Sequence, residues 1–203
     1  MAVLILDPTL EKRVRAERGD KTRDEVWDGV LVMSPEANLE HQDFGGELAF
    51  IFRSALGSRR AGRVYPGVNV SDRDEGWLEN FRIPDVAVYL AGNPALSRVT
   101  HYVGGPDLAV EIISRFDRAR DKSTFYANIG VREFLVIDRD PWVIELYRPE
   151  GGAMVMVART TPNGGDPVRL DVPPLILQFV AGADQPTIEV VHETDGRRWT
   201  IGD

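Results

Sequence analysis

Cysteine is absent from this chain of 203 residues, and only three histidines are present. Disulfides and thiolate metal sites are therefore excluded, and a zinc centre is an unfavourable interpretation because the three histidines are well separated in the sequence. No apolar run approaches the ~18 residues of a membrane-spanning helix. The N-terminal apolar segment is too short for a secretory signal, and acidic residues follow it closely. We therefore expect a cytoplasmic protein without a membrane partner.

Basic residues are few for a protein that binds nucleic acid, since 24 Lys and Arg stand against 32 Asp and Glu, a net charge of −8. Proteins that bind phosphate normally use clustered Lys and Arg. Arginines nevertheless gather within residues 48–71, which contain no acid, and around Lys122. The members of the two groups are Arg53, Arg59, Arg60 and Arg63, and Arg115, Arg118 and Arg120. A solvated face without a ligand is the alternative interpretation of these arginines.

The composition, 43% hydrophobic and 28% charged, is that of one globular domain over residues 1–203. We place its core at about residues 20–160 and a β-rich C-terminal extension, either a cap or a dimer arm, at about residues 161–203. No internal repeat, low-complexity tract or clear linker divides the chain.

The order of the expected elements describes a mixed β-sheet flanked by helices, an α/β sandwich. Asp28-Gly29 between apolar pairs predicts a β-hairpin, and Gly57 ends a helix that begins near Ser34. Pro66-Gly67 breaks the strand expected at 63–70, which indicates an edge, a bulge or a bend. The other expectations are helices at 9–18 and from about 118, loops at 71–80, 91–105 and 162–174, strands at 86–90, 108–113, 132–138, 141–148, 153–158, 187–191 and 198–201, and a strand or helical turn at 175–180.

Two acidic residues occupy apolar strand patterns in the middle of the chain. Glu111 lies inside the continuous run LAVEII, which is typical of a strand covered on both faces, and Asp85 precedes the alternating strand at 86–90. An ionised carboxylate in such a place persists only if it is paired or bound to a metal, because burial otherwise raises its pKa. If the two strands are neighbours, both carboxylates can converge on Mg²⁺, which prefers one or two carboxylates with waters and a substrate phosphate.

Lys122 follows Glu111 at the start of the next predicted helix. Helical spacing places Lys122, Phe125, Tyr126 and Ile129 on one face, so we expect the lysine to face the sheet. Two carboxylates and one lysine are the minimal set for metal-assisted hydrolysis of a phosphodiester. The ammonium group orients the attacking water and neutralises the phosphate.

At these residues the sequence resembles the PD-(D/E)XK nuclease superfamily and, more narrowly, the bacterial Uma-type "putative restriction endonuclease" family, over about residues 20–160. The matching stretches are EVWDGVLVMSP with His41 six residues beyond Pro35, RIPDVAVYL, PDLAVEIIS and KSTFYANIGVREFLVID. The resemblance implies a restriction-endonuclease-like fold with an extra N-terminal hairpin, and magnesium-dependent endonuclease activity on DNA. It also implies a homodimer, since nucleases of this fold often pair to cut two strands.

The resemblance further implies that Asp85 and Glu111 hold the metal, that Lys122 is the catalytic lysine and that His41 belongs to the active site. We expect the carbonyl oxygen of Ile112 to be a third metal ligand, and Mn²⁺ to be able to replace Mg²⁺.

This sequence departs from the family pattern around the lysine. The position two after the strand glutamate is Ile113, so the lysine has moved onto the following helix. Relatives usually carry Ser-Pro where Ser114-Arg115 stands here, with a longer loop before the lysine. Whether Asp117 or Asp121 matches the family's acidic residue ahead of the lysine stays open.

Two other functions remain as alternatives. In the first, the nuclease-like fold serves binding or assembly, and Glu111 and Lys122 form a buried ion pair that admits no metal. In the second, the protein hydrolyses small phosphorylated molecules instead of nucleic-acid polymers.

Overall fold

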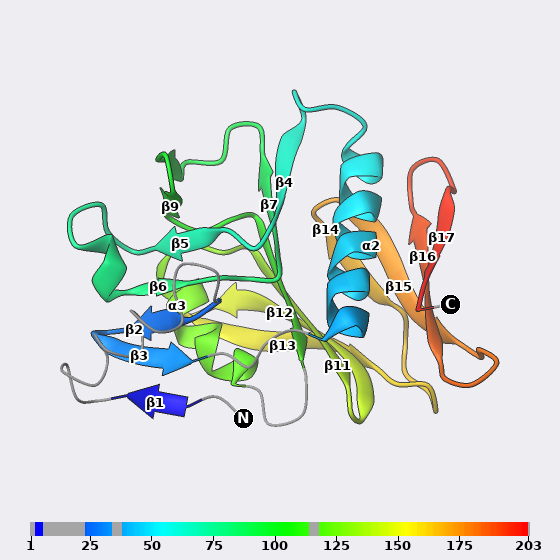
Figure 1. Cartoon of the computed structure of the whole chain (residues 1–203). Coiled ribbons are helices and arrows are strands. Elements are labelled where there is room, and N and C mark those ends of the chain that lie inside the picture. The colour runs from blue at the N-terminus through cyan, green and yellow to red at the C-terminus, as the bar shows by residue number, and fades with distance from the viewer. Residues whose placement is uncertain (1–2, 6–22, 34–37, 114–117, 203) are drawn as a thin grey trace.

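The computed structural model describes residues 3–5, 23–33, 38–113 and 118–202. Within them the chain forms three β-sheets and two α-helices (Figure 1). The helix predicted at residues 9–18 lies outside the described residues.

A six-stranded sheet carries the two acidic strands, in the order β13-β12-β11-β10-β7-β4. Strands β10 and β11 are parallel, and the other neighbours are antiparallel. Every residue of β10 is buried, as its continuous apolar run predicts. The strands predicted for this sheet are confirmed. Strand β4 ends at Pro66 and lies at the edge of the sheet. The bounds are β4 Gly62–Pro66, β7 Val86–Leu90, β10 Leu108–Ile113, β11 Glu133–Arg139, β12 Trp142–Glu150 and β13 Ala153–Thr160.

Helix α2 (Leu39–Leu56) packs on one face of this sheet (Figure 1). The side chain of Asn38 caps its first turn by accepting a hydrogen bond from the backbone N–H of His41. Gly57 ends it at φ 68°, a left-handed conformation that glycine adopts without strain. The predicted helix is confirmed from Leu39 onward, and its expected start at Ser34 lies outside the described residues.

Helix α3 (Ser123–Asn128) and the preceding 3₁₀ helix η3 (Ala119–Lys122) pack on the opposite face. A seven-stranded sheet, in the order β1-β3-β2-β6-β5-β9-β8, lies beside them. Its strand β9 contacts the central sheet through Tyr102, which stacks on Tyr89 of β7 at 4.0 Å. The bounds are β1 Val3–Ile5, β2 Glu25–Trp27, β3 Val30–Met33, β5 Asn69–Ser71, β6 Phe81–Arg82, β8 Leu96–Ser97 and β9 His101–Val103.

The predicted hairpin at Asp28-Gly29 is confirmed, with φ 50° and 81° at the two turn residues. Two predicted loops are wrong in part. Strands β8 and β9 form within 91–105, and 71–80 holds the 3₁₀ helix η2 (Trp77–Glu79), whose Trp77 stacks on His101. Each of these elements is two or three residues long, too short for a hydrophobic period to develop.

The C-terminal extension forms a four-stranded antiparallel sheet, in the order β14-β15-β16-β17. Its residues Leu175, Ile188 and Ile201 belong to the same apolar core as α2 and β10. The strands predicted at 187–191 and 198–201 are confirmed, and of the strand or helical turn predicted at 175–180 the structure shows the strand. Strand β14 appears in the expected loop at 162–174. The bounds are β14 Val168–Asp171, β15 Pro174–Val180, β16 Thr187–His192 and β17 Arg198–Ile201.

The described residues thus confirm the predicted mixed sheet flanked by helices, with an added N-terminal hairpin and a β-rich C-terminal extension. None of their helices combines the length and the apolar character that a membrane crossing needs.

Candidate active site

Strands β7 and β10 bring the two predicted acidic residues next to each other. In the antiparallel register Val86 pairs with Val110. Asp85 directly precedes Val86 and Glu111 directly follows Val110, so the next step of the same register sets their main chains opposite one another. The backbone N–H of Ile112 donates a 2.8 Å hydrogen bond to Oδ2 of Asp85. The Asp85 side chain therefore reaches across to β10.

Three donors hold the Asp85 carboxylate. Besides the Ile112 N–H, Nε2 of His41 lies 2.9 Å from Oδ1, and Nη1 of Arg23 donates to the same oxygen at 2.8 Å. Burial alone raises the pKa of Asp85, but the hydrogen bond and charge of His41, with the Ile112 N–H, outweigh burial and lower it overall. Asp85 is therefore ionised at neutral pH, and His41 fixes its position from helix α2.

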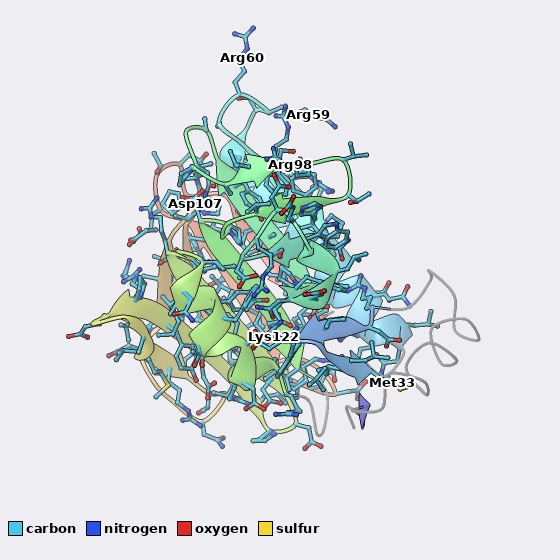
Figure 2. All side chains as sticks on the ribbon, turned by 90° about the vertical axis from the view of Figure 1, so that its left-hand side faces the viewer. Met33, Arg59, Arg60, Arg98, Asp107 and Lys122 are labelled. Carbon is cyan, nitrogen blue, oxygen red and sulfur yellow. The ribbon has the colours of Figure 1, made fainter. Side chains whose placement is uncertain are left out.

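Glu111 contacts a second set of groups, on the α3 side of the sheet. Nζ of Lys122 lies 2.8 Å from both of its carboxylate oxygens, and the Tyr126 hydroxyl donates to Oε1 at 2.6 Å. All three residues are buried. Lys122 is the last residue of η3 and Tyr126 follows one helical turn later, so the predicted helix face is confirmed. Figure 2 shows Lys122 between the α3 ribbon and the blue strands β2 and β3.

Glu25 of β2 is a third buried carboxylate in this cluster, and no sequence pattern predicted it. Its Oε1 lies 2.7 Å from Nζ of Lys122. The backbone N–H of Ile83 and the indole N–H of Trp27 each donate to the Glu25 carboxylate at 2.7 Å. The available signal was an acid at the head of a short apolar strand pattern, as for Asp85. Strand β2 has only three residues, so that pattern is too short to stand out.

The charged groups of this cluster shift one another's pKa values. Burial raises the pKa of Glu111 to about 8; the Lys122 ammonium opposes the shift, whereas Asp85 and Glu25 add to it. Burial alone lowers the pKa of Lys122, but the two glutamates outweigh burial and raise it well above its usual range. Burial and the same glutamates raise the pKa of Tyr126. Lys122 is therefore a permanent cation, and Glu111 takes up a proton at a higher pH than an ordinary glutamate.

A family model described as "putative restriction endonuclease", Uma2, matches residues 10–179. The chain belongs to the Uma2 family. Among solved structures it is similar to the crystal structure of a "putative nuclease belonging to DUF820" from Anabaena variabilis ATCC 29413, with a TM-score of 0.58 and 18% sequence identity. The match covers 71% of this chain and 80% of that one. At this identity the likeness shows a shared fold. No curated protein matches the chain.

The donor set of this Uma2 protein suits a cation that takes few side-chain ligands. Among the described residues, no three or more His, Cys, Asp or Glu side chains are grouped to hold a metal ion. A centre built from side chains alone, which structural zinc sites use, is therefore not found there. Magnesium needs only one or two carboxylates, and Asp85 and Glu111 are the two that the register of β7 with β10 sets opposite one another. The charges of Asp85 and Glu25 beside Glu111 also favour a bound cation.

The acidic residues just ahead of the lysine do not add to this cluster within the described residues. Asp121 is half exposed, with 51% of its side-chain surface accessible, and it pairs with Arg118 at 2.7 Å. Asp117 lies outside the described residues. Arg120 bonds Asp138 and Glu145. The arginines next to Lys122 that the structure describes are therefore engaged with carboxylates of their own.

Proposed function

We propose that this Uma2 protein is a magnesium-dependent endonuclease that hydrolyses DNA phosphodiester bonds. The observation that carries the proposal is the pairing of β7 with β10, which sets Asp85 beside Glu111, with Nζ of Lys122 2.8 Å from the Glu111 carboxylate. Family membership supports a nuclease-type activity.

Asp85 and Glu111, with the carbonyl oxygen of Ile112, hold Mg²⁺ in this proposal, and Mn²⁺ can replace it. When bound, the ion supplies positive charge that polarises the phosphate and makes water a stronger nucleophile at neutral pH. His41 is a positioning residue, since its Nε2 holds Oδ1 of Asp85.

Lys122 supplies a fixed positive charge to the reacting phosphate. Its ammonium group is kept protonated by Glu111 and Glu25, so it donates hydrogen bonds without giving up its proton. In this position it orients the attacking water or stabilises the pentavalent transition state. Tyr126 and Glu25 hold the Glu111–Lys122 pair in place.

Cleavage of supercoiled and linear DNA, with Mg²⁺, Mn²⁺ or EDTA, tests the proposal. Asp85→Ala, Glu111→Ala and Lys122→Ala should each lower the rate by about 10²-fold or more, the usual cost of removing a preorganised electrostatic group. Asp121→Ala, which removes an exposed carboxylate close in sequence, is the matched control and should cleave like the wild type. Cleavage that survives undiminished in all three variants refutes the site. Activity on nucleotides without activity on polymers assigns a small phosphorylated substrate instead.

The Lys122–Glu111 ion pair supports a second candidate, a nuclease-like fold that serves binding or assembly without catalysis. Calorimetric titration separates the two. Binding of Mg²⁺ or Mn²⁺ that Asp85→Ala abolishes supports the nuclease, whereas no binding at millimolar metal supports the silent fold.

A homodimer is part of the proposal, because two copies are needed to cut both strands of a duplex together. Light scattering at several protein concentrations measures the mass. A monomer at every concentration that still makes double-strand breaks contradicts the dimer.

A further inference from the structure

Arginines without carboxylate partners gather at the turn between α2 and β4. Arg59, Arg60 and Arg63 are exposed, and none of them forms an ion pair with a carboxylate of the described residues. Figure 2 shows Arg59 and Arg60 at one tip of the molecule. In a chain of net charge −8, three such cations form an unusual concentration of positive charge.

These arginines line a pocket together with aromatic side chains. Its volume is about 550 Å³, and we call it the arginine–tyrosine pocket. The residues that matter to its chemistry are Arg59, Arg60, Arg63, Tyr65, Tyr89 and Tyr102. The ring of Tyr102 stacks on Tyr89, and the hydroxyls of Tyr65 and Tyr102 lie 3.0 Å apart. The pocket therefore has an aromatic wall beside exposed cationic side chains.

One polar atom of this wall has no partner. The hydroxyl of Tyr89 is buried and makes no hydrogen bond, and the residue as a whole is 4% exposed. Asp107 is the carboxylate whose charge raises the pKa of Tyr89. That carboxylate is already held by the backbone N–H of Leu90, the Asn93 amide and Arg132. An unsatisfied donor beside unpaired arginines points to an anionic ligand.

Two residues of the pocket, Arg63 and Tyr89, project from the face of the sheet that carries Glu111. Arg63 of β4 pairs with Tyr89 of β7, and Ala87 of β7 pairs with Ala109 of β10. Side chains alternate along each strand, so Arg63, Tyr89 and Glu111 project from the same face. From Asp85 to Leu90 the chain advances five residues, about 17 Å, which equals the rise of about five base pairs of duplex DNA.

We propose that the arginine–tyrosine pocket binds the phosphate backbone of a nucleic-acid strand about five nucleotides from the bond that is cut. The inference rests on the proposed endonuclease function, which it extends by a second contact region. Arginine guanidinium groups bind phosphate through paired hydrogen bonds, and the aromatic wall limits the pocket on the side away from the arginines.

Binding of a fluorescently labelled duplex, measured by anisotropy in EDTA over a range of salt concentrations, tests this inference without any cleavage. The double variant Arg59→Gln/Arg60→Gln should bind about tenfold more weakly, and the slope of log affinity against log salt should fall by about two. The matched control is Arg169→Gln/Arg198→Gln, which removes two exposed arginines that are paired with Glu193 and Glu189. This control should change affinity less than twofold.

Three results overturn the inference: equal losses in the two double variants, no loss in the Arg59/Arg60 variant, and no binding of DNA by the wild type. Competition separates the possible sources of the phosphate. Inorganic phosphate or AMP that binds as tightly as the oligonucleotide assigns a small-molecule pocket and also overturns the inference.

The cleavage assay keeps this outcome separate from the proposed function. If the Arg59/Arg60 variant selectively loses DNA binding and the wild type does not cleave, the phosphate contact is supported and the nuclease function is refuted. If cleavage depends on Lys122 and all arginine variants bind DNA equally well, the nuclease function is supported and the phosphate contact is refuted.

Discussion

Lys122 is the cation that makes two buried carboxylates tolerable at the centre of the molecule. Its Nζ lies 2.8 Å from Glu111 and 2.7 Å from Glu25, and all three side chains are buried. Above the Glu111 pKa of about 8, replacing Lys122 with Met leaves two uncompensated charges in the interior. We expect the free energy of unfolding, measured by urea denaturation, to fall by about 3–5 kcal/mol.

The double variant Glu25→Gln/Lys122→Met is the control for this prediction. Neutralising one carboxylate should restore part of the stability that Lys122→Met loses, because a single buried acid remains and can take up a proton. A loss below about 1 kcal/mol in Lys122→Met contradicts the charge argument, since surface ion pairs contribute that little.

Glu111 makes stability depend on pH in a direction opposite to that of most carboxylates. Its pKa is about 8 in the folded protein and 4.5 in the unfolded chain, so between these values the folded state binds the additional proton. As pH rises from 5 to 8, the unfolded state is favoured by on the order of 1 kcal/mol per pH unit from this group.

Glu111→Gln removes this titration. In chemical denaturation without added metal, we therefore expect the stability of the variant relative to the wild type to increase steadily from pH 5 to pH 8. Glu189, whose pKa is lowered by hydrogen bonds from Arg198 and Gln178, provides a control variant, Glu189→Gln, that should show no such increase. If the difference in stability between Glu111→Gln and the wild type does not change with pH, Lys122 keeps Glu111 ionised over this whole range.

Helix α2 matters as an element because its first turn carries His41 to Asp85. The helix begins at Leu39 because the Asn38 side chain accepts the backbone N–H of His41 at 2.8 Å. Asn38→Ala should cost about 1 kcal/mol of unfolding free energy, the usual value of an N-cap, whereas Asn38→Asp should cost almost nothing. Equal losses in both variants contradict a capping role. The measurement is thermal unfolding followed by circular dichroism.

At the scale of the whole molecule, Glu133 ties the C-terminal sheet to the central one. Its carboxylate accepts a 2.7 Å hydrogen bond from Arg148 and the backbone N–H groups of Asp171 and Val172 at 3.0 and 2.9 Å. Glu133 is 2% exposed, so no water replaces a lost acceptor. Glu133→Gln replaces one of the two acceptor oxygens that face these donors with an NH2 group, which is itself a donor. We expect a loss of roughly 1–3 kcal/mol, because the amide keeps one acceptor oxygen for the Asp171 and Val172 N–H groups while its NH2 group faces the Arg148 guanidinium, which loses its acceptor.

Hydrogen exchange shows whether that loss is local. Amides of β14 to β17 should exchange faster than those of β10 and β11 in Glu133→Gln, since the C-terminal sheet loses its attachment first. Glu193→Gln, which breaks an exposed pair with Arg169, is the control and should leave exchange unchanged. Uniform acceleration over the whole chain contradicts a local attachment.

The sequence by itself determined the elements whose patterns are long or chemically distinct. The apolar run around Glu111, the Asp28-Gly29 turn, the helix ended by Gly57 and the face shared by Lys122 and Tyr126 all follow from local period and turn chemistry. Family motifs pointed to Asp85, Glu111 and Lys122 in the same way. These features depend on residues that are neighbours in the sequence, so the sequence alone predicts them.

Only the tertiary structure decided which groups meet. Glu25 lies in a three-residue strand and reaches Lys122 only because β2 pairs with β6 beside α3. Strands β8, β9 and β14 are too short for a period, and they exist because a neighbouring strand pairs with them. The Asp85–Ile112 hydrogen bond and the arginine–tyrosine pocket likewise need the register of β7 with β10 and β4. Such contacts join residues far apart in the chain, and no local pattern specifies them.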